Sequence, residues 1–131
     1  MIRLAAIAFL AVHGLVHWIG FAIPWRLMAS QDNPYSTAVL WGSVDLGETG
    51  IRLLGVAWLV PIALFIVAAL AIWRRVRSAL FLTTLAAAVS LVLCVLGMPG
   101  AVIGTAIDVG ILALVAARLV VGPGRMATLA R

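Results

Sequence analysis

The sequence predicts an all-α membrane protein, a four-transmembrane-helix bundle with one long extracytoplasmic loop. Of the 131 residues, 66% are hydrophobic and only 10% are charged, whereas a soluble domain is about 25% charged. Four apolar runs are each long enough to cross about 30 Å of hydrocarbon as a helix. A chain of this length has too little interior to hide them in water. We therefore expect a single membrane domain over residues 1–131.

The first predicted span covers residues 4–25, an uncharged run between Arg3 and Arg26 that contains two histidines. We expect it to remain as a membrane helix, because it is longer than the apolar core of a signal peptide and no convincing small-residue cleavage site follows it. His13 and His17 are four residues apart and share one helix face. In hydrocarbon, both imidazoles require partners.

Residues 26–49 form the one long predicted loop, in which polar residues alternate with short apolar pieces. Trp25 and Trp41 carry the amphipathic rings expected at the lipid headgroups, so we expect the loop to lie on the membrane surface and cap one end of the bundle. Asp45 and Glu48 are expected to cap and pair the start of the helix that follows.

The second span is predicted over residues 50–73. Glu48 and Arg52 are four residues apart, which favours a helical ion pair at its start. Pro61 should kink the helix, because proline has no backbone N–H for the carbonyl one turn earlier.

The third and fourth spans are predicted over residues 78–97 and 101–121, joined by a tight turn. The third contains the single cysteine, Cys94, within an apolar run, so no intramolecular disulfide is available. The fourth carries Asp108 and is expected to end at the Gly-Pro-Gly sequence that begins at residue 122.

All nine basic residues are arginines, and they gather beside the ends of the apolar runs rather than along one face, which argues against a nucleic-acid partner. In a four-span arrangement, one side holds Arg3, Arg74, Arg75, Arg77, Arg118, Arg125 and Arg131. The other side holds Arg26 and Arg52 with Asp32, Asp45 and Glu48. The positive-inside rule then places both termini in the cytoplasm and the loop outside. The predicted interface anchors are Trp25, Trp41, Trp73, Arg74, Arg75 and Arg77.

Polar residues of different spans are expected at a shared depth. Counted by helix rise from the cytoplasmic side, His13 lies about 15 Å, Ser90 about 18 Å, Asp108 about 20 Å and His17 about 21 Å into the membrane. Thr105 is one turn from Asp108. A charged carboxylate at this depth costs at least about 2.5–3.5 kcal/mol, so Asp108 should face the bundle, be protonated or pair with a histidine.

Three interpretations of the histidines remain open: structural hydrogen bonding between helices, ligation of a cofactor, and proton handling. The predicted buried polar or proton-handling group is Asp108, His13, His17, Ser90 and Thr105. His13 and His17 are the candidate cofactor-binding residues, with haem, a pigment or a metal as the ligand. Two histidines on one helix are a weak metal signature, and a third ligand is required, for which Asp108 is the only plausible buried candidate. No metal site and no catalytic residue is predicted.

The leading functional interpretation is a non-enzymatic subunit or scaffold of a membrane assembly, whose partners are the lipid bilayer and other membrane proteins or a second copy. A small transporter or proton-coupled carrier that uses Asp108 is the first alternative, and a haem-, pigment- or metal-binding subunit is the second. An enzyme is not expected, because the sequence has no nucleophile elbow, zinc-protease motif or phosphate loop.

Five segments carry a family resemblance: His13-Gly-Leu-Val-His17-Trp-Ile-Gly-Phe21, Pro24-Trp25-Arg26-Leu27, Pro34-Tyr35-Ser36-Thr37, Val44-Asp45-Leu46-Gly47 and Gly104-Thr-Ala-Ile-Asp108. Over nearly its whole length, the chain resembles a group of small four-helix bacterial membrane proteins from GC-rich actinobacteria and their relatives, which are often labelled permease-like. The resemblance implies four spans in a bacterial cytoplasmic membrane and draws attention to His13, His17, Asp45 and Asp108. It implies no residue role.

Overall fold

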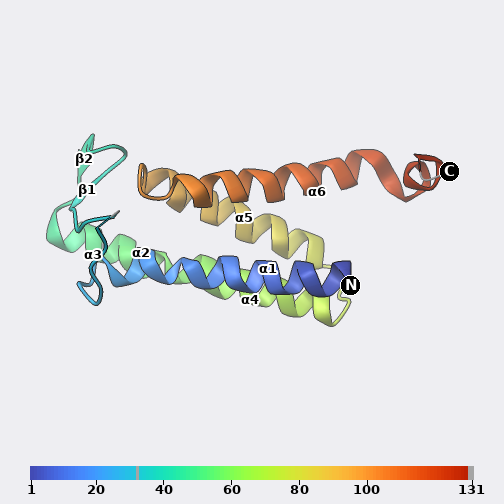
Figure 1. Cartoon of the computed structure of the whole chain (residues 1–131), viewed down its shortest axis with the longest axis horizontal. Helices are drawn as coiled ribbons and strands as arrows, with labels where there is room; N and C mark the ends of the chain where they lie inside the picture. Colours follow the sequence, from blue (N-terminus) through green and yellow to red (C-terminus); the bar gives the residue numbers. More distant parts are fainter. Residues whose placement is uncertain (32, 130–131) are drawn as a thin grey trace.

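The chain folds as an all-α bundle of four packed helical rods (Figure 1). The computed structural model describes residues 1–31 and 33–129, and only the backbone of 121–129. Asp32, Arg131 and the side chain of Arg125 therefore lie outside what is described. By length and composition, each rod is a candidate membrane span, over Ile2–Ala22, Gly47–Trp73, Ala79–Leu96 and Val102–Val120. The prediction of a multi-pass membrane protein is confirmed at this level.

The first rod is interrupted in the part nearer the long loop. It consists of α1 (Ile2–Val16) and α2 (Trp18–Ala22), with His17 between them. The backbone N–H of His17 donates to the carbonyl of Gly14 at 3.2 Å, which is a tighter turn than an α-helix makes. The sequence predicted one continuous helix over residues 4–25. It did not reveal this interruption, because the cause is a contact of the His17 side chain with the carbonyl of His13.

The second rod is also divided, as the proline in it predicts. It consists of α3 (Gly47–Ala57) and α4 (Leu59–Trp73), with Trp58 between them. Pro61 lies in the first turn of α4, where a missing N–H costs no helical hydrogen bond. The break therefore falls three residues before the proline rather than at it.

The third and fourth rods are single helices, α5 (Ala79–Leu96) and α6 (Val102–Leu129). As far as its side chains are described, the apolar part of α6 runs from Val102 to Val120. The helix itself continues through Gly-Pro-Gly to Leu129, where the sequence predicted a stop. Proline removes one backbone hydrogen bond and bends a helix without having to end it, and Figure 1 shows α6 changing direction near its C-terminal end.

The rods pack in chain order, α1 on α4, α4 on α5 and α5 on α6. In Figure 1, α1 and α4 run side by side, α6 lies at the opposite side, and α5 crosses between them. Both termini are at the same end of the bundle and the long loop is at the other. Gly14 permits a close approach of α1 to α4, since a Cβ added there would lie 2.7 Å from Cβ of Phe65.

The loop closes one end of the bundle, as its composition predicted. It contains a short antiparallel hairpin of β1 (Ala38–Val39) and β2 (Val44–Asp45). The N–H groups of Leu40 and Trp41 in its turn donate to the carbonyls of Leu96 and Met98, each at 3.0 Å. These bonds satisfy carbonyls that the end of α5 leaves without helical donors.

The predicted interface anchors lie at the two ends of the bundle and are exposed. Trp25 and Trp41 lie at the loop end, and the other end carries Trp73, Arg74, Arg75 and Arg77. Their anchoring at the lipid headgroups stays a prediction.

Two apolar clusters form the interior. One holds Leu10, Phe65, Ala68, Ala69, Ala86, Ala87 and Ile111. The other lies nearer the loop and holds Trp58, Leu93 and Cys94. Along α1, α5 and α6, the candidate polar residues fall at or just beyond the loop side of the first cluster, which makes them a polar layer inside an apolar bundle.

Candidate functional site

Four polar side chains from three helices form one continuous hydrogen-bonded chain, which we call the polar network: His13, Asp108, Ser90 and His17. Nε2 of His13 lies 2.9 Å from Oδ1 of Asp108. The hydroxyl of Ser90 lies 2.5 Å from Oδ2 of Asp108 and 2.5 Å from Nε2 of His17. The network therefore links α1, α5 and α6 at one depth.

The polar network unites most, but not all, of the residues that the sequence singled out. His13 and Asp108 are 95 positions apart in the chain and are in direct contact, as expected if Asp108 pairs with a histidine. Ser90 bridges Asp108 and His17. Thr105 stands apart, because its hydroxyl donates to the carbonyl of Ala101 on its own helix at 3.1 Å.

The interruption of the first rod belongs to this network. Nδ1 of His17 donates to the carbonyl of His13 at 2.8 Å, and that carbonyl would otherwise accept the N–H of residue 17 in a regular α-helix. The side chain thus replaces the backbone donor, and the backbone N–H of His17 turns to Gly14. As a result, Nε2 of His17 is directed towards Ser90.

The polar network is shut off from the surface of the protein. His13 and His17 are 5% and 4% exposed, and Ser90 and Asp108 are 0% exposed. The two imidazoles meet edge to face at 4.9 Å between ring centroids. Phe65 packs edge-on against His13 at 4.9 Å. Such aromatic packing keeps water away and strengthens each hydrogen bond inside.

Two arrangements of protons satisfy every contact without a net charge. In the first, Asp108 is ionised, Ser90 donates to it, and His17 donates to Ser90 as an imidazolium. In the second, Asp108 is protonated and donates to Ser90, and Ser90 donates to a neutral His17. Since the two differ only by a proton passed through the serine hydroxyl, the network can hold that proton at either end.

No family model, curated protein or solved structure matches this chain. Only the geometry of the polar network therefore indicates what chemistry it can perform. The resemblance drawn from the sequence segments adds nothing to that geometry.

As the network stands, a haem or pigment could be ligated by either histidine only if that histidine gave up its hydrogen-bond partner. Both Nε2 atoms point at hydrogen-bond partners inside the network, Asp108 for His13 and Ser90 for His17. A macrocycle would have to occupy the positions that these partners fill. The ring of His17 also contacts Trp58, with 5.5 Å between centroids. One potential ligand atom of each of His13, His17 and Asp108 lies within 4.8 Å of the other two. These three atoms are therefore close enough together to be the ligands of a single metal ion.

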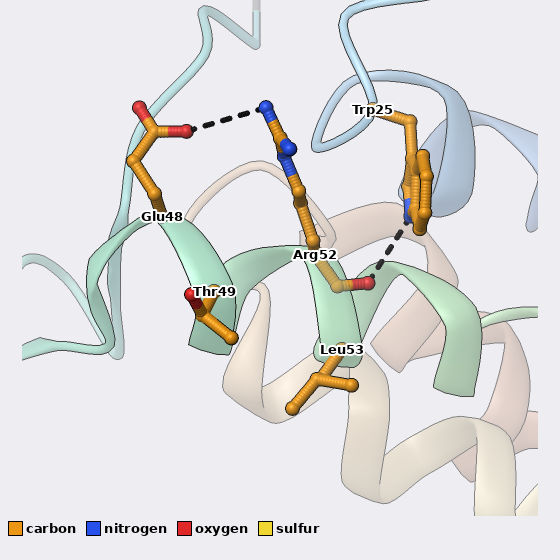
Figure 2. Close-up of a pocket in the computed structure, with 5 residues that line it drawn as sticks. All are labelled: Trp25, Glu48, Thr49, Arg52 and Leu53. Carbon is orange, nitrogen blue, oxygen red and sulfur yellow. Dashed lines mark hydrogen bonds and ion pairs between the residues drawn. The ribbon is translucent and has the colours of Figure 1, made fainter.

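A second polar group lies at the loop end and is exposed. Glu48 contacts Arg26 at 2.6 Å and Arg52 at 3.7 Å, the latter being the predicted helical pair. Figure 2 shows Glu48 and Arg52 beside Trp25, whose indole N–H donates to the carbonyl of Arg52 at 3.1 Å. These contacts tie the end of the first rod to the start of the second. Trp25, Glu48 and Arg52 line a shallow surface pocket. Among the described residues, no hydrogen bond or ion pair joins this group to the polar network.

Asp45 lies one residue before Leu46, which is the N-cap of α3 and has no side-chain cap hydrogen bond. Oδ1 of Asp45 accepts the N–H of Gly47, the first residue of the helix, at 3.0 Å. This hydrogen bond lowers the pKa of the Asp45 carboxyl from its usual value, because it favours the ionised form.

Sequence reasoning missed two parts of the site. The aromatic enclosure by Trp58 and Phe65 is one: the residues are seven apart on the second rod, a spacing that places them on one helix face. The other is the contact of Ser90 with Cys94, at 3.9 Å, which their spacing of four residues on α5 also signals.

Proposed function

We propose that this protein is a non-enzymatic subunit or scaffold of a membrane assembly, in which the polar network holds the helices in register. The observation that carries the proposal is the closed chain from His13 through Asp108 and Ser90 to His17, buried and joined to three helices. Each member is hydrogen-bonded to another member of the network, so the direct effect of the network is on helix packing. Membrane helices commonly use such interhelical hydrogen bonds.

The apolar exterior supports the same proposal. Large apolar side chains on α6 are well exposed, among them Ile103, Leu114 and Leu119. A bilayer or a neighbouring membrane protein is the environment that covers such a surface. We expect the chain to be found with membrane-protein partners or as a homo-oligomer.

Native electrophoresis after mild detergent extraction from the source membrane tests the subunit proposal. We expect one discrete species larger than a single chain in a micelle, with a constant ratio of components across preparations. Asp108→Leu, which breaks the polar network, should dissociate this species, whereas Asp108→Asn, which preserves its hydrogen-bonding capacity, should not. A chain that always isolates alone and monomeric would rule the proposal out.

We further propose a bacterial cytoplasmic membrane, with both termini on the cytoplasmic side. The arginines Arg74, Arg75 and Arg77 lie at the end of the bundle that carries the termini, and the positive-inside rule assigns that end to the cytoplasm. In a Cys94→Ser background, a cysteine placed at Ser43 should react with a membrane-impermeant maleimide in intact spheroplasts. One placed at Arg77 should react only after lysis, and the reverse pattern would invert the topology.

A proton-coupled carrier is the second candidate, and the proton shared between Asp108 and His17 favours it. Reconstituted liposomes with an internal pH dye would report proton movement when a potassium diffusion potential is applied. A carrier of this kind should lose its flux in Asp108→Asn, which cannot release a proton, and keep it in Thr105→Val, which lies outside the network. Equal fluxes in wild type and Asp108→Asn would remove this candidate.

A further inference from the structure

We propose that His13, His17 and Asp108 bind one divalent first-row transition metal ion of the zinc type. Their ligand atoms lie within 4.8 Å of one another, and they come from the two rods at opposite sides of the bundle. Two imidazole nitrogens and one carboxylate are a donor set that such ions favour. This site goes beyond the subunit role, which does not depend on a metal.

His17 is already held as a metal-ligating histidine is held. Its Nδ1–H donates to the carbonyl of His13 at 2.8 Å, and metal-bound histidines almost always donate their second ring N–H to such an acceptor. Nδ1 therefore carries the proton, and Nε2, which lies 2.5 Å from the hydroxyl of Ser90, is the nitrogen left to ligate an ion. The break in the first rod is what provides the carbonyl.

His13 and Asp108 supply the other two donors. Nε2 of His13 lies 2.9 Å from Oδ1 of Asp108, and the two atoms share a hydrogen bond. When an ion binds, the neutral ring of His13 shifts its single proton from Nε2 to Nδ1, so that Nε2 offers its lone pair to the ion, and the one proton shared by Asp108 and His17 is released to solvent. Nitrogen donors disfavour calcium and magnesium, which take oxygen ligands.

Ser90 competes with the ion rather than ligating it. Its hydroxyl lies 2.5 Å from Nε2 of His17 and 2.5 Å from Oδ2 of Asp108, so it occupies the space between two of the ligands. Ligands of a tetrahedral zinc ion are about 3.3 Å apart. The three side chains must therefore draw together from separations of up to 4.8 Å, and Ser90 must give up its bridge as they do.

The test is metal analysis of protein made in cells grown with added zinc or cobalt, so that the ion is present before the helices close. We expect about one ion per chain after purification in mild detergent and gel filtration. The cobalt form should show the intense visible absorption of a tetrahedral site. His17→Gln and Asp108→Asn should each lower the affinity at least about tenfold.

Three control variants separate this site from other causes of metal binding. Ser90→Ala removes the competing hydroxyl and none of the ligands, so it should bind the ion at least as tightly as wild type. Cys94→Ser and Thr105→Val should leave the stoichiometry unchanged. Asp108→Asn keeps hydrogen-bonding partners for its neighbours, so a monodisperse gel-filtration peak can confirm that its loss of metal is not a loss of fold.

The proposal is overturned by any of three results. The first is wild-type protein that carries no stoichiometric zinc or cobalt. The second is metal retained in full by folded Asp108→Asn, and the third is metal lost in Cys94→Ser. The subunit proposal fails on a different measurement, the size of the native species, so the two failures are distinguishable.

Discussion

Asp108 on α6 accepts a hydrogen bond from His13 on α1 at 2.9 Å, although 95 positions of the chain separate them. The two residues belong to helices at opposite sides of the bundle. Both are buried in a layer whose upper and lower neighbours are apolar. This pair therefore connects the first rod to the last through the interior.

Two substitutions of Asp108 should distinguish the contribution of its hydrogen bonds to stability from that of its charge. Asparagine can accept from His13 and donate to Ser90, which reproduces the neutral proton arrangement, so Asp108→Asn should change the free energy of unfolding by less than about 1 kcal/mol. Asp108→Leu leaves Nε2 of His13 buried and unpaired and removes one of the two partners of Ser90, so it should cost about 1–3 kcal/mol. Thermal unfolding in detergent measures both. Equal losses in the two variants would mean that the charge itself is essential.

Gly14 should be intolerant of a side chain, whereas Gly110 should tolerate one. A Cβ at Gly14 would lie 2.7 Å from Cβ of Phe65, and a Cβ at Gly110 meets nothing within 4 Å. Gly14→Ala should push α1 from α4 and destabilise the protein by about 1–3 kcal/mol. Gly110→Ala should be neutral or stabilising by up to about 1 kcal/mol, because alanine is the better helix former. Unfolding midpoints of the two variants, measured in one detergent, make the comparison.

Cys94 should report the opening of the polar layer. Its side chain is buried, and its sulfur lies 3.9 Å from the hydroxyl of Ser90. We expect negligible maleimide labelling of the native protein and complete labelling after denaturation, because access requires α5 and α6 to separate. Asp108→Leu should label faster than Asp108→Asn. Rapid labelling of native wild type would contradict the observed packing of Cys94.

Asp45 should make a small pH-dependent contribution to stability. The N–H of Gly47 lowers its pKa in the folded state below the usual 3.8. The stabilisation is therefore complete above the unfolded pKa and is lost as the pH falls through the lower folded value. A carbon-13 NMR titration should find the midpoint below 3.8. Asp45→Asn, which still accepts the hydrogen bond, should remove this part of the acid dependence.

Much of the architecture is predictable from local sequence. The four spans follow from apolar runs whose lengths match the bilayer, and the division of the second rod follows from Pro61. The hydrogen bond from Gly47 to Asp45 and the pair of Glu48 with Arg52 follow from short-range spacing. Each of these features depends on residues at most a few turns apart.

Other features depend on contacts that spacing does not reveal. The break at His17 arises because its ring takes the carbonyl of His13, which is a choice of side-chain rotamer. The contact of Arg26 with Glu48 depends on how the loop folds back. Thr105 and Ser90 are expected at similar depths in the membrane. Only Ser90 enters the polar network, because the rotation of α5 about its axis turns Ser90 inward, whereas the hydroxyl of Thr105 bonds to its own helix.

The sequence by itself determined the membrane class, the number of spans and the depth of the polar residues, because hydrophobic length and helix rise are properties of single segments. The tertiary structure decided which polar groups meet. Helix rotation and packing order set the distances among His13, Ser90 and Asp108, and a rotation of less than half a turn would place any of them in lipid. The buried network, and with it the donor set for an ion, exists only once the four rods are assembled.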